Sequence, residues 1–301
     1  MEYKQITETC SYFHGNVNVG YIKKGNTGLL IDAGLDEGAA KKITKILQNN
    51  KWPLTHLFIT HAHADHYGGA SYLQKKFQVS IFAPKFEEAI LSYPKLESIY
   101  LFNGVEPPQE LRNKFIEGNP IHVDVVCEEG EQTIGDINIL LHPLPGHSYG
   151  QLGLECEGIL YAADAYFDKK TLHKHNIPFV IDVNQTIESL KRLMTIDVIG
   201  AVPGHGVYEE NYQETIQLNI EYHLQVKQEC LTYIQEQKHV EWEQMSKNMC
   251  TLRGIQITNI TSWALYRTAV AAYVQALVLD GKVEYAFVEN SFVIKENKNK
   301  G

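Results

Sequence analysis

The segment THAHADHYGG, residues 60–69, carries three histidines and one aspartate within six positions. Imidazole nitrogen and carboxylate oxygen are ligands that zinc and similar divalent metals take. In an extended chain His61 and His63, two positions apart, point the same way. Asp65 and His66 are adjacent and point elsewhere, which suits a second metal beside the first. The segment therefore predicts a metal site with ligands for two ions.

The flanking residues place this segment between a strand and a helix. Residues 54–59 form an apolar run long enough for a buried strand, and residues 70–77 have a helical pattern. Gly68 and Gly69 allow a tight turn between the ligands and that helix. A loop of this kind holds ligands on a rigid scaffold. A surface loop that is rich in histidine by chance is the alternative, which the spacing and the flanks disfavour.

Length, charge and cysteine content limit the class of protein. The chain has 301 residues, enough for one large domain or a large and a small one. Its formal net charge of −9 argues against bulk non-specific binding of nucleic acid, which needs a basic surface. Five widely spaced cysteines without a CxxC pair indicate a reducing compartment. We see no signal segment and no apolar run near the roughly 20 residues that span a membrane, so we expect a cytoplasmic protein without membrane contact.

The first part of the chain alternates strands and helices. Residues 1–35 have strand patterns, residues 37–49 predict an amphipathic helix, and residues 79–83 predict a further strand after the metal segment. This order indicates a layered α/β fold. Residues 93–120 form a long aromatic-containing connection, which either covers a site or packs on itself.

Further candidate ligands follow later apolar strands. The strand predicted at 137–144 ends near His147, the strand at 159–163 ends at Asp164, and the strand at 198–202 ends near His205. Loops at the ends of neighbouring strands converge on one edge of a sheet, so we expect these side chains to meet the first segment there.

These motifs together resemble those of the metallo-β-lactamase-fold hydrolase superfamily. The resemblance is carried by HxHxDH with Gly-Gly at 61–69, Gly-His-Ser at 146–148, Ala-Asp at 163–164 and Pro-Gly-His-Gly at 203–206. It implies an αββα four-layer sandwich with a metal-dependent hydrolase site. The family commonly has Asp-Thr-Gly where this chain has Asp-Ala-Gly at 32–34, so a role for the threonine hydroxyl is not carried over.

The resemblance also implies how two metals are held. The first metal takes three histidines, the second takes an aspartate and two histidines, and one aspartate bridges both: His61, His63 and His147; Asp65, His66 and His205; Asp164. Zinc is the preferred ion, with iron and manganese as alternatives. A hydroxide bound to both metals would attack the substrate, and Asp65 would orient it as the catalytic carboxylate.

Other residues near these motifs each have two possible roles, one structural and one functional. Asp32 either caps the helix that follows it or hydrogen-bonds a metal-bound histidine; the cap is the preferred reading. Four further side chains could contact substrate, although they could equally be packing residues: Tyr67, Phe167, His175 and Phe179.

The last hundred residues differ in character, and we divide the chain into a hydrolase domain (1–209) and a C-terminal domain (210–301). Helices are predicted at 211–237, 242–252 and 258–279, before two strands that turn at 289–290, which resembles a winged-helix-like module. From residue 215 onward nine Lys and Arg balance nine Asp and Glu. Nucleic-acid binding is therefore less favoured than packing on the hydrolase domain or a homodimer contact.

The sequence thus predicts an enzyme, a metallo-hydrolase of small esters, thioesters or lactones. A phosphodiesterase or ribonuclease that uses the same site is the first alternative. A mononuclear iron oxidoreductase, such as the persulfide dioxygenases of the superfamily, is the second, and the full ligand set for a second metal disfavours it.

Overall fold

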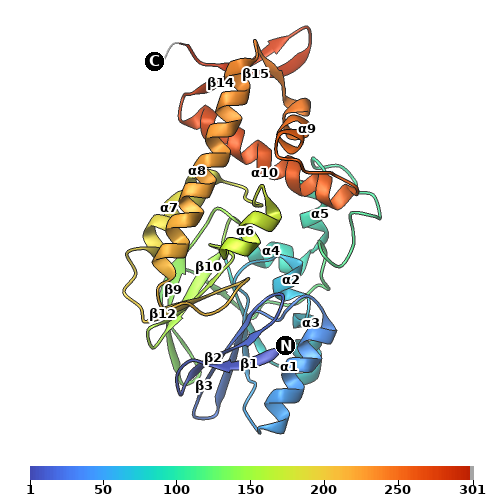
Figure 1. Cartoon of the computed structure of the whole chain (residues 1–301). Helices are drawn as coiled ribbons and strands as arrows, with labels where there is room; N and C mark the ends of the chain where they lie inside the picture. Colours follow the sequence, from blue (N-terminus) through green and yellow to red (C-terminus); the bar gives the residue numbers. More distant parts are fainter. Residues whose placement is uncertain (299–301) are drawn as a thin grey trace.

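Two β-sheets face each other and carry helices on their outer surfaces (Figure 1). The computed structural model describes residues 1–298, so the last three residues of the predicted C-terminal domain lie outside the described part. The first sheet contains, in spatial order, β1 (Glu2–Gln5), β2 (Cys10–His14), β3 (Val19–Lys24), β4 (Thr27–Ile31), β5 (His56–Phe58), β6 (Ser80–Pro84) and β7 (Val125–Cys127). Strands β1 to β4 are antiparallel, and β4 to β7 are parallel.

The second sheet is mostly antiparallel. It contains, in spatial order, β12 (Gly200–Pro203), β11 (Ile159–Ala163), β10 (Leu152–Cys156), β9 (Ile137–Pro143) and β8 (Gly130–Ile134). Only the β11–β12 pair in this sheet is parallel. Its β10–β11 hairpin turns at residues 157–158.

Side chains alternate between two cores along each central strand. In β4, Leu29 packs between the sheets, whereas Leu30 packs on the helical side. In β11, Tyr161 packs between the sheets, whereas Leu160 packs on the outer helices. Both faces of each sheet are therefore covered, which explains why these strands read as continuous apolar runs.

Helices form the two outer layers. Helices α1 (Glu37–Asn49) and α3 (Ala70–Phe77) cover the first sheet, and α7 (Val183–Leu193) with the start of α8 (Tyr212–Glu236) covers the second. The predicted αββα four-layer sandwich is confirmed.

Shorter helices lie in the connections. They are α2 (Ala64–Tyr67), α4 (Glu87–Ser92), α5 (Lys95–Leu101) and α6 (Lys169–His175). The long connection at 93–120 packs against the C-terminal region, because Leu101, Leu111 and Ile116 form one apolar cluster with Ala264. The metal segment itself is only partly extended, since residues 64–67 form a single helical turn.

The C-terminal region consists of α8, β13 (Val240–Glu241), α9 (Trp242–Leu252), α10 (Ile260–Leu279), β14 (Val283–Val288) and β15 (Ser291–Glu296). The two predicted strands form a hairpin, and β13 adds a third strand that is too short to give a sequence pattern. Helix α8 contributes Ile216 to the core of the sandwich and Val226 to the core of the C-terminal region. The division at residues 209 and 210 stays a proposal.

No helix in residues 1–298 is both long and apolar enough to cross a membrane. The cytoplasmic location stays a prediction.

Candidate metal centre

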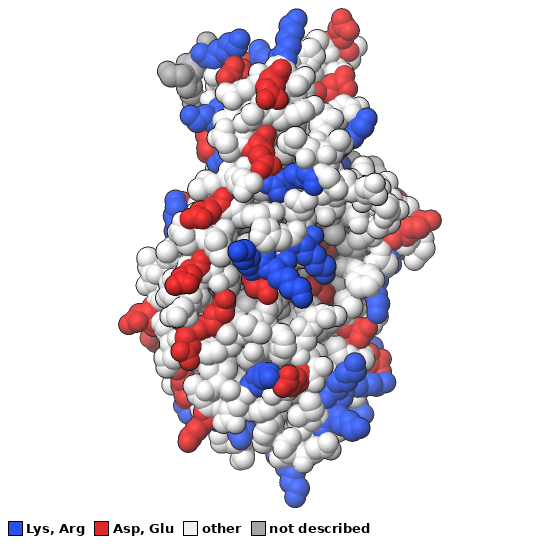
Figure 2. Space-filling model, viewed as in Figure 1, with Lys and Arg blue, Asp and Glu red and all other residues white. Residues whose placement is uncertain are grey.

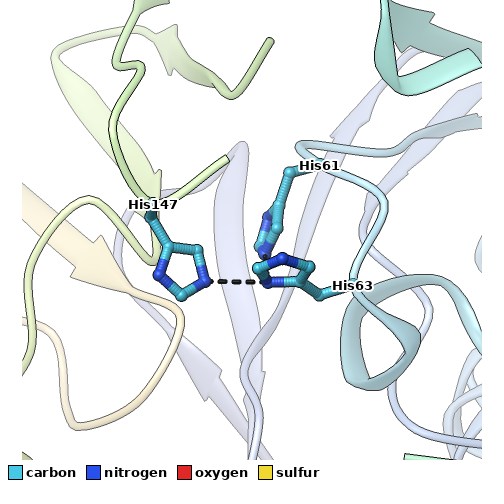
Figure 3. Close-up of side chains that lie close together, drawn as sticks. All are labelled: His61, His63 and His147. Carbon is cyan, nitrogen blue, oxygen red and sulfur yellow. Dashed lines mark hydrogen bonds between the residues drawn. The ribbon is translucent and has the colours of Figure 1, made fainter. Parts of the chain in front are cut away.

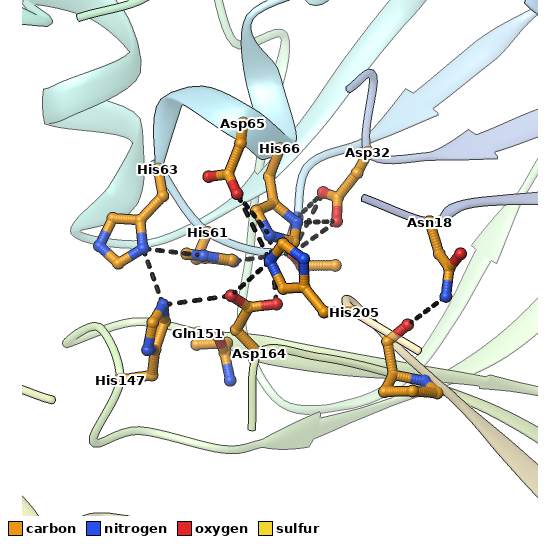
Figure 4. Close-up of polar contacts among 12 residues, drawn as sticks. Asn18, Asp32, His61, His63, Asp65, His66, His147, Gln151, Asp164 and His205 are labelled. Atoms are coloured by element: carbon orange, nitrogen blue, oxygen red, sulfur yellow. Dashed lines mark hydrogen bonds and ion pairs between the residues drawn. The ribbon is translucent and has the colours of Figure 1, made fainter. Parts of the chain in front are cut away.

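Seven polar side chains from four separate chain segments point toward one region at an edge of the sandwich (Figure 4). Four of them follow β5, and the others follow β9, β11 and β12: His61, His63, Asp65 and His66; His147; Asp164; His205. The predicted convergence of loops at strand ends is therefore what brings these residues together.

The first group consists of His61, His63 and His147, whose candidate ligand atoms all lie within 4.8 Å of one another. His63 Nδ1 lies 3.1 Å from His61 Nε2 and 2.8 Å from His147 Nε2 (Figure 3). His147 Nδ1 donates a hydrogen bond to the carbonyl oxygen of Phe179 at 2.9 Å, so its Nε2 keeps a free lone pair toward the group.

The second group consists of Asp65, His66 and His205. His66 Nδ1 donates to Asp32 Oδ2 at 2.7 Å, and His205 Nδ1 donates to the carbonyl oxygen of Asn16 at 2.7 Å. Since each acceptor holds the proton on Nδ1, each Nε2 is left as a metal-binding atom that faces Asp65.

Asp164 lies between the two groups. Its Oδ1 is 3.2 Å from His66 Nε2, and its Oδ2 is 3.5 Å from His147 Nε2 and 3.3 Å from His205 Nε2. The carboxylate thus contacts histidines of both sets, as a bridging ligand must.

The fit of a cation to these residues rests on two buried atoms. His66 Nε2 and Asp164 Oδ1 are close together, yet neither makes a hydrogen bond to any residue in 1–298. Buried polar atoms rarely stay unsatisfied in native structures. An imidazole nitrogen and a carboxylate oxygen that converge in this way are a donor set suited to zinc or another divalent transition metal.

The electrostatic environment differs between the two groups. Burial lowers the pKa of His63 to about 4 and that of His147 to about 3, so both rings are neutral at pH 7. Burial also opposes charge on His205, but Asp164 and Asp65 outweigh it and raise the pKa to about 10. The histidines of the first group are therefore neutral at pH 7, whereas Asp164 and Asp65 keep a proton on His205 Nε2 that a bound metal ion would displace.

Asp32 orients His66 rather than capping a helix. Its carboxylate accepts hydrogen bonds from His66 Nδ1, from Thr60 N at 2.9 Å and from Thr60 Oγ1. Helix α1 is capped by Asp36, which accepts from Ala39 N. The preferred reading of Asp32 as a cap was wrong, because Asp36 lies directly before the first helical turn. Asp32 also has a φ of 67°, in the left-handed region, which aspartate tolerates better than most non-glycine residues.

Neighbouring residues fix the loop of His205. Asn18 Nδ2 donates to the carbonyl oxygens of Pro203 and Gly206 at 2.8 and 3.0 Å. A side chain at Gly204 would place its Cβ 2.0 Å from Asp164 Oδ1. The Pro-Gly-His sequence therefore permits the close approach of this loop to the bridging carboxylate.

The four candidate substrate contacts have different positions. The ring of Phe167 lies 5.8 Å from His147 and 6.0 Å from His205, and the ring of Phe179 lies 5.5 Å from His63. His175 is exposed and its ring lies 5.9 Å from Phe167. These three remain candidates for substrate contact.

Tyr67 does not lie in a position to contact substrate. It has no exposed surface and packs in the core beneath the first sheet, where its hydroxyl accepts a hydrogen bond from Gly118 N. The expectation for this residue needs correction, because the helical turn at 64–67 directs it away from the ligands.

Sequence reasoning missed Glu87. This buried side chain on α4 accepts hydrogen bonds from Ala62 N at 2.8 Å, Ser148 Oγ at 2.8 Å and Gly150 N at 2.7 Å. It therefore links the loop of His61 and His63 to the loop of His147. No motif surrounds it, and a glutamate in the first turn of a helix is usually exposed.

We predict that Glu87→Gln weakens this link. The amide keeps one acceptor oxygen, but its NH₂ group faces hydrogen-bond donors, so the free energy of unfolding should fall by about 1–3 kcal/mol. Chemical denaturation of metal-free protein measures this loss, and a metal titration should show weaker binding. Glu88→Gln on the same helix is the control; equal effects of the two variants would contradict the assigned role of Glu87.

An αββα sandwich with a histidine–carboxylate cluster at one edge is typical of metallo-hydrolases. The family model of the metallo-beta-lactamase superfamily matches residues 13–205, so the chain belongs to this superfamily.

Individual relatives agree with that class. A probable metallo-hydrolase of Bacillus subtilis is 30% identical over 58% of this chain and 73% of its own length. A hydroxyacylglutathione hydrolase of Vibrio campbellii is 32% identical over 45% of this chain, and the matched part spans 42% of that relative. A beta-lactamase domain protein from Burkholderia ambifaria shares the fold with a TM-score of 0.75, at 16% identity, over 98% of this chain and 94% of its own.

These findings confirm the predicted family, the fold and the class of enzyme. The number and identity of the metals and the role of each ligand stay predictions.

Proposed function

We propose that the chain hydrolyses small esters, thioesters or lactones with two divalent metal ions, preferably zinc. The observation that carries this proposal is the position of Asp164 between two groups of metal-binding side chains. The relative named hydroxyacylglutathione hydrolase supports an acyl substrate, although the match covers less than half of that protein.

The residues present fit two ions. His61, His63 and His147 would hold the first, Asp65, His66 and His205 the second, and Asp164 both. When bound, such ions supply Lewis acidity and lower the pKa of coordinated water toward 7.

The protein groups around this site orient the reaction. Asp32 and the carbonyl oxygens of Asn16 and Phe179 hold three histidine rings with Nε2 toward the site. The side chain of Asp65 is 34% exposed and is therefore within reach of substrate and water. We assign to its carboxylate the acceptance of a hydrogen bond from the attacking water, which orients the attack. Phe167 and Phe179 flank the histidines with apolar surface, which restricts water there.

A hydrolysis screen tests this proposal. Metal-replete protein is assayed on acyl thioesters, lactones, p-nitrophenyl esters, bis-p-nitrophenyl phosphate and RNA, with chelator-treated protein as control. We expect turnover of carbonyl compounds that chelation abolishes and added zinc restores. Turnover confined to the phosphodiesters would favour the alternative function, and oxygen uptake with bound iron would favour an oxidoreductase. Binding of nucleic acid and formation of a homodimer stay predictions.

A further inference from the structure

Helix α6 carries an unpaired group of positive charges. Lys169, Lys170 and Lys174 are exposed, and within residues 1–298 none of them forms an ion pair or a hydrogen bond through its ammonium group. Figure 2 shows a blue group at the centre of the face, where Figure 1 places α6. The chain as a whole has a formal net charge of −9, so this local excess of positive charge is opposite in sign to the charge of the whole chain.

This helix lies directly beside the candidate metal centre. Phe167, just before its first turn, contacts the rings of His147 and His205. The ring of His175, the last residue of the helix, lies 5.9 Å from the ring of Phe167. The lysines are thus carried by a segment that begins and ends at the rim of the site.

Contacts at both ends hold α6 in place. At its start, Phe167 N donates to Asn219 Oδ1 at 3.0 Å, and Asn219 Nδ2 donates to the carbonyl oxygen of Phe167 at 2.8 Å. After its end, the carbonyl oxygen of Asn176 accepts from Tyr222 and Arg253, and Asn176 Nδ2 donates to the carbonyl oxygen of Arg253 at 2.7 Å. The backbone that carries the lysines is therefore held in place relative to the ligand histidines and is not a free loop.

We propose that α6 recognises an anionic group on the substrate, a carboxylate or a phosphate outside the bond that is cleaved. This inference rests on the proposed acyl hydrolysis and specifies its substrate class. Unpaired ammonium groups at the rim of a site raise the local concentration of anions and orient them as they enter. Three lysines on one seven-residue helix suit a small anion better than a nucleic acid, which contacts a longer basic surface. Figure 2 shows a second group of blue atoms at the lower right, where Figure 1 places α1, and elsewhere on this face Lys and Arg are interspersed with Asp and Glu.

Matched substrates that differ in one charge test the proposal. The phosphate arm compares S-acetyl-4′-phosphopantetheine with S-acetylpantetheine. The carboxylate arm compares S-acetyl-3-mercaptopropionate with its amide. We expect kcat/KM to be at least about tenfold higher for the charged member of one or both pairs at low salt, and the preference to shrink as salt rises.

The variant K169Q/K170Q/K174Q should reduce that preference to about twofold, while turnover of the neutral substrates stays within about twofold of wild type. The variant K42Q/K45Q/K75Q changes three exposed lysines on α1 and α3 and should keep the preference. The proposal is overturned if wild type shows no preference for the charged substrates, or if the α6 variant and the control variant show the same preference. Salt-dependent RNA binding that only the α6 variant loses, without a charge preference among thioesters, would instead assign α6 to nucleic acid.

A binding measurement separates this inference from the proposed function. Calorimetric titration compares 4′-phosphopantetheine with pantetheine, and 3-mercaptopropionate with its amide, so no turnover is needed. One or both anions should bind at least about tenfold more tightly than their neutral counterparts, and only the α6 variant should lose this difference. This result supports anion recognition by α6 even if no thioester is hydrolysed. Equal binding of both members in both pairs overturns the inference even if thioesters are cleaved.

Discussion

Asp164→Asn is expected to lower kcat/KM by about 10³-fold or more and to reduce the metal content. The carboxylate contacts His66, His147 and His205, so its charge is shared by both ligand groups. An amide of the same size has a neutral oxygen and binds a divalent cation more weakly. Loss of several kcal/mol of transition-state stabilisation corresponds to this decrease in rate.

Elemental analysis and steady-state kinetics on the same preparation measure both effects. Asp197→Asn, at an exposed position outside the ligand set, is the control and should bind metal and turn over as wild type does. An Asp164→Asn protein with full metal content and full activity would show that Asp164 is not a shared ligand.

Asp65→Asn should retain the fold and lose about 10²- to 10⁴-fold in kcat, the size of effect usual for a side chain that acts on the attacking water. Asp65 is the most exposed carboxylate of the set, and its Oδ2 lies 3.4 Å from His205 Nε2. Burial opposes its ionisation, but His66 and His205 outweigh it and lower the pKa to about 2, so the group is a carboxylate at pH 7.

The two aspartate variants should differ in a second measurement. Asp65→Asn removes a ligand of one metal only, so it should keep at least the metal held by His61, His63 and His147. Because the pKa of Asp65 is about 2, the acidic limb of a pH–rate profile should keep its position in this variant, and the loss should appear as a lower kcat at every pH. Unchanged kcat in a variant that keeps the first metal would contradict the assigned role.

Much of the fold could be predicted from local patterns. The bounds of α1 and α3 follow from apolar periodicity and from the glycines and polar residues beside them. Strands buried on both faces gave continuous apolar runs, and each ligand lies just past such a run. The candidate ligands could therefore be found because strand ends and metal-binding residue types coincide.

Residues that act through long-range contacts could not be found in this way. Glu87 meets Ala62 and Ser148 only after α4 has packed between two loops that are far apart in sequence. Asp32 was assigned to the nearest helix, although its partner His66 lies 34 positions away. Helix α6 was missed because Leu172 is its only buried residue, so no apolar stripe marks it.

Anomalous X-ray diffraction from zinc-replete crystals tests the central claim most directly, because it places each ion relative to the side chains. We predict two peaks, one at about 2.0–2.2 Å from nitrogens of His61, His63 and His147, and one at this distance from Asp65, His66 and His205, with Asp164 contacting both. The absence of any peak among these seven residues, or peaks only elsewhere on the protein, would contradict the account.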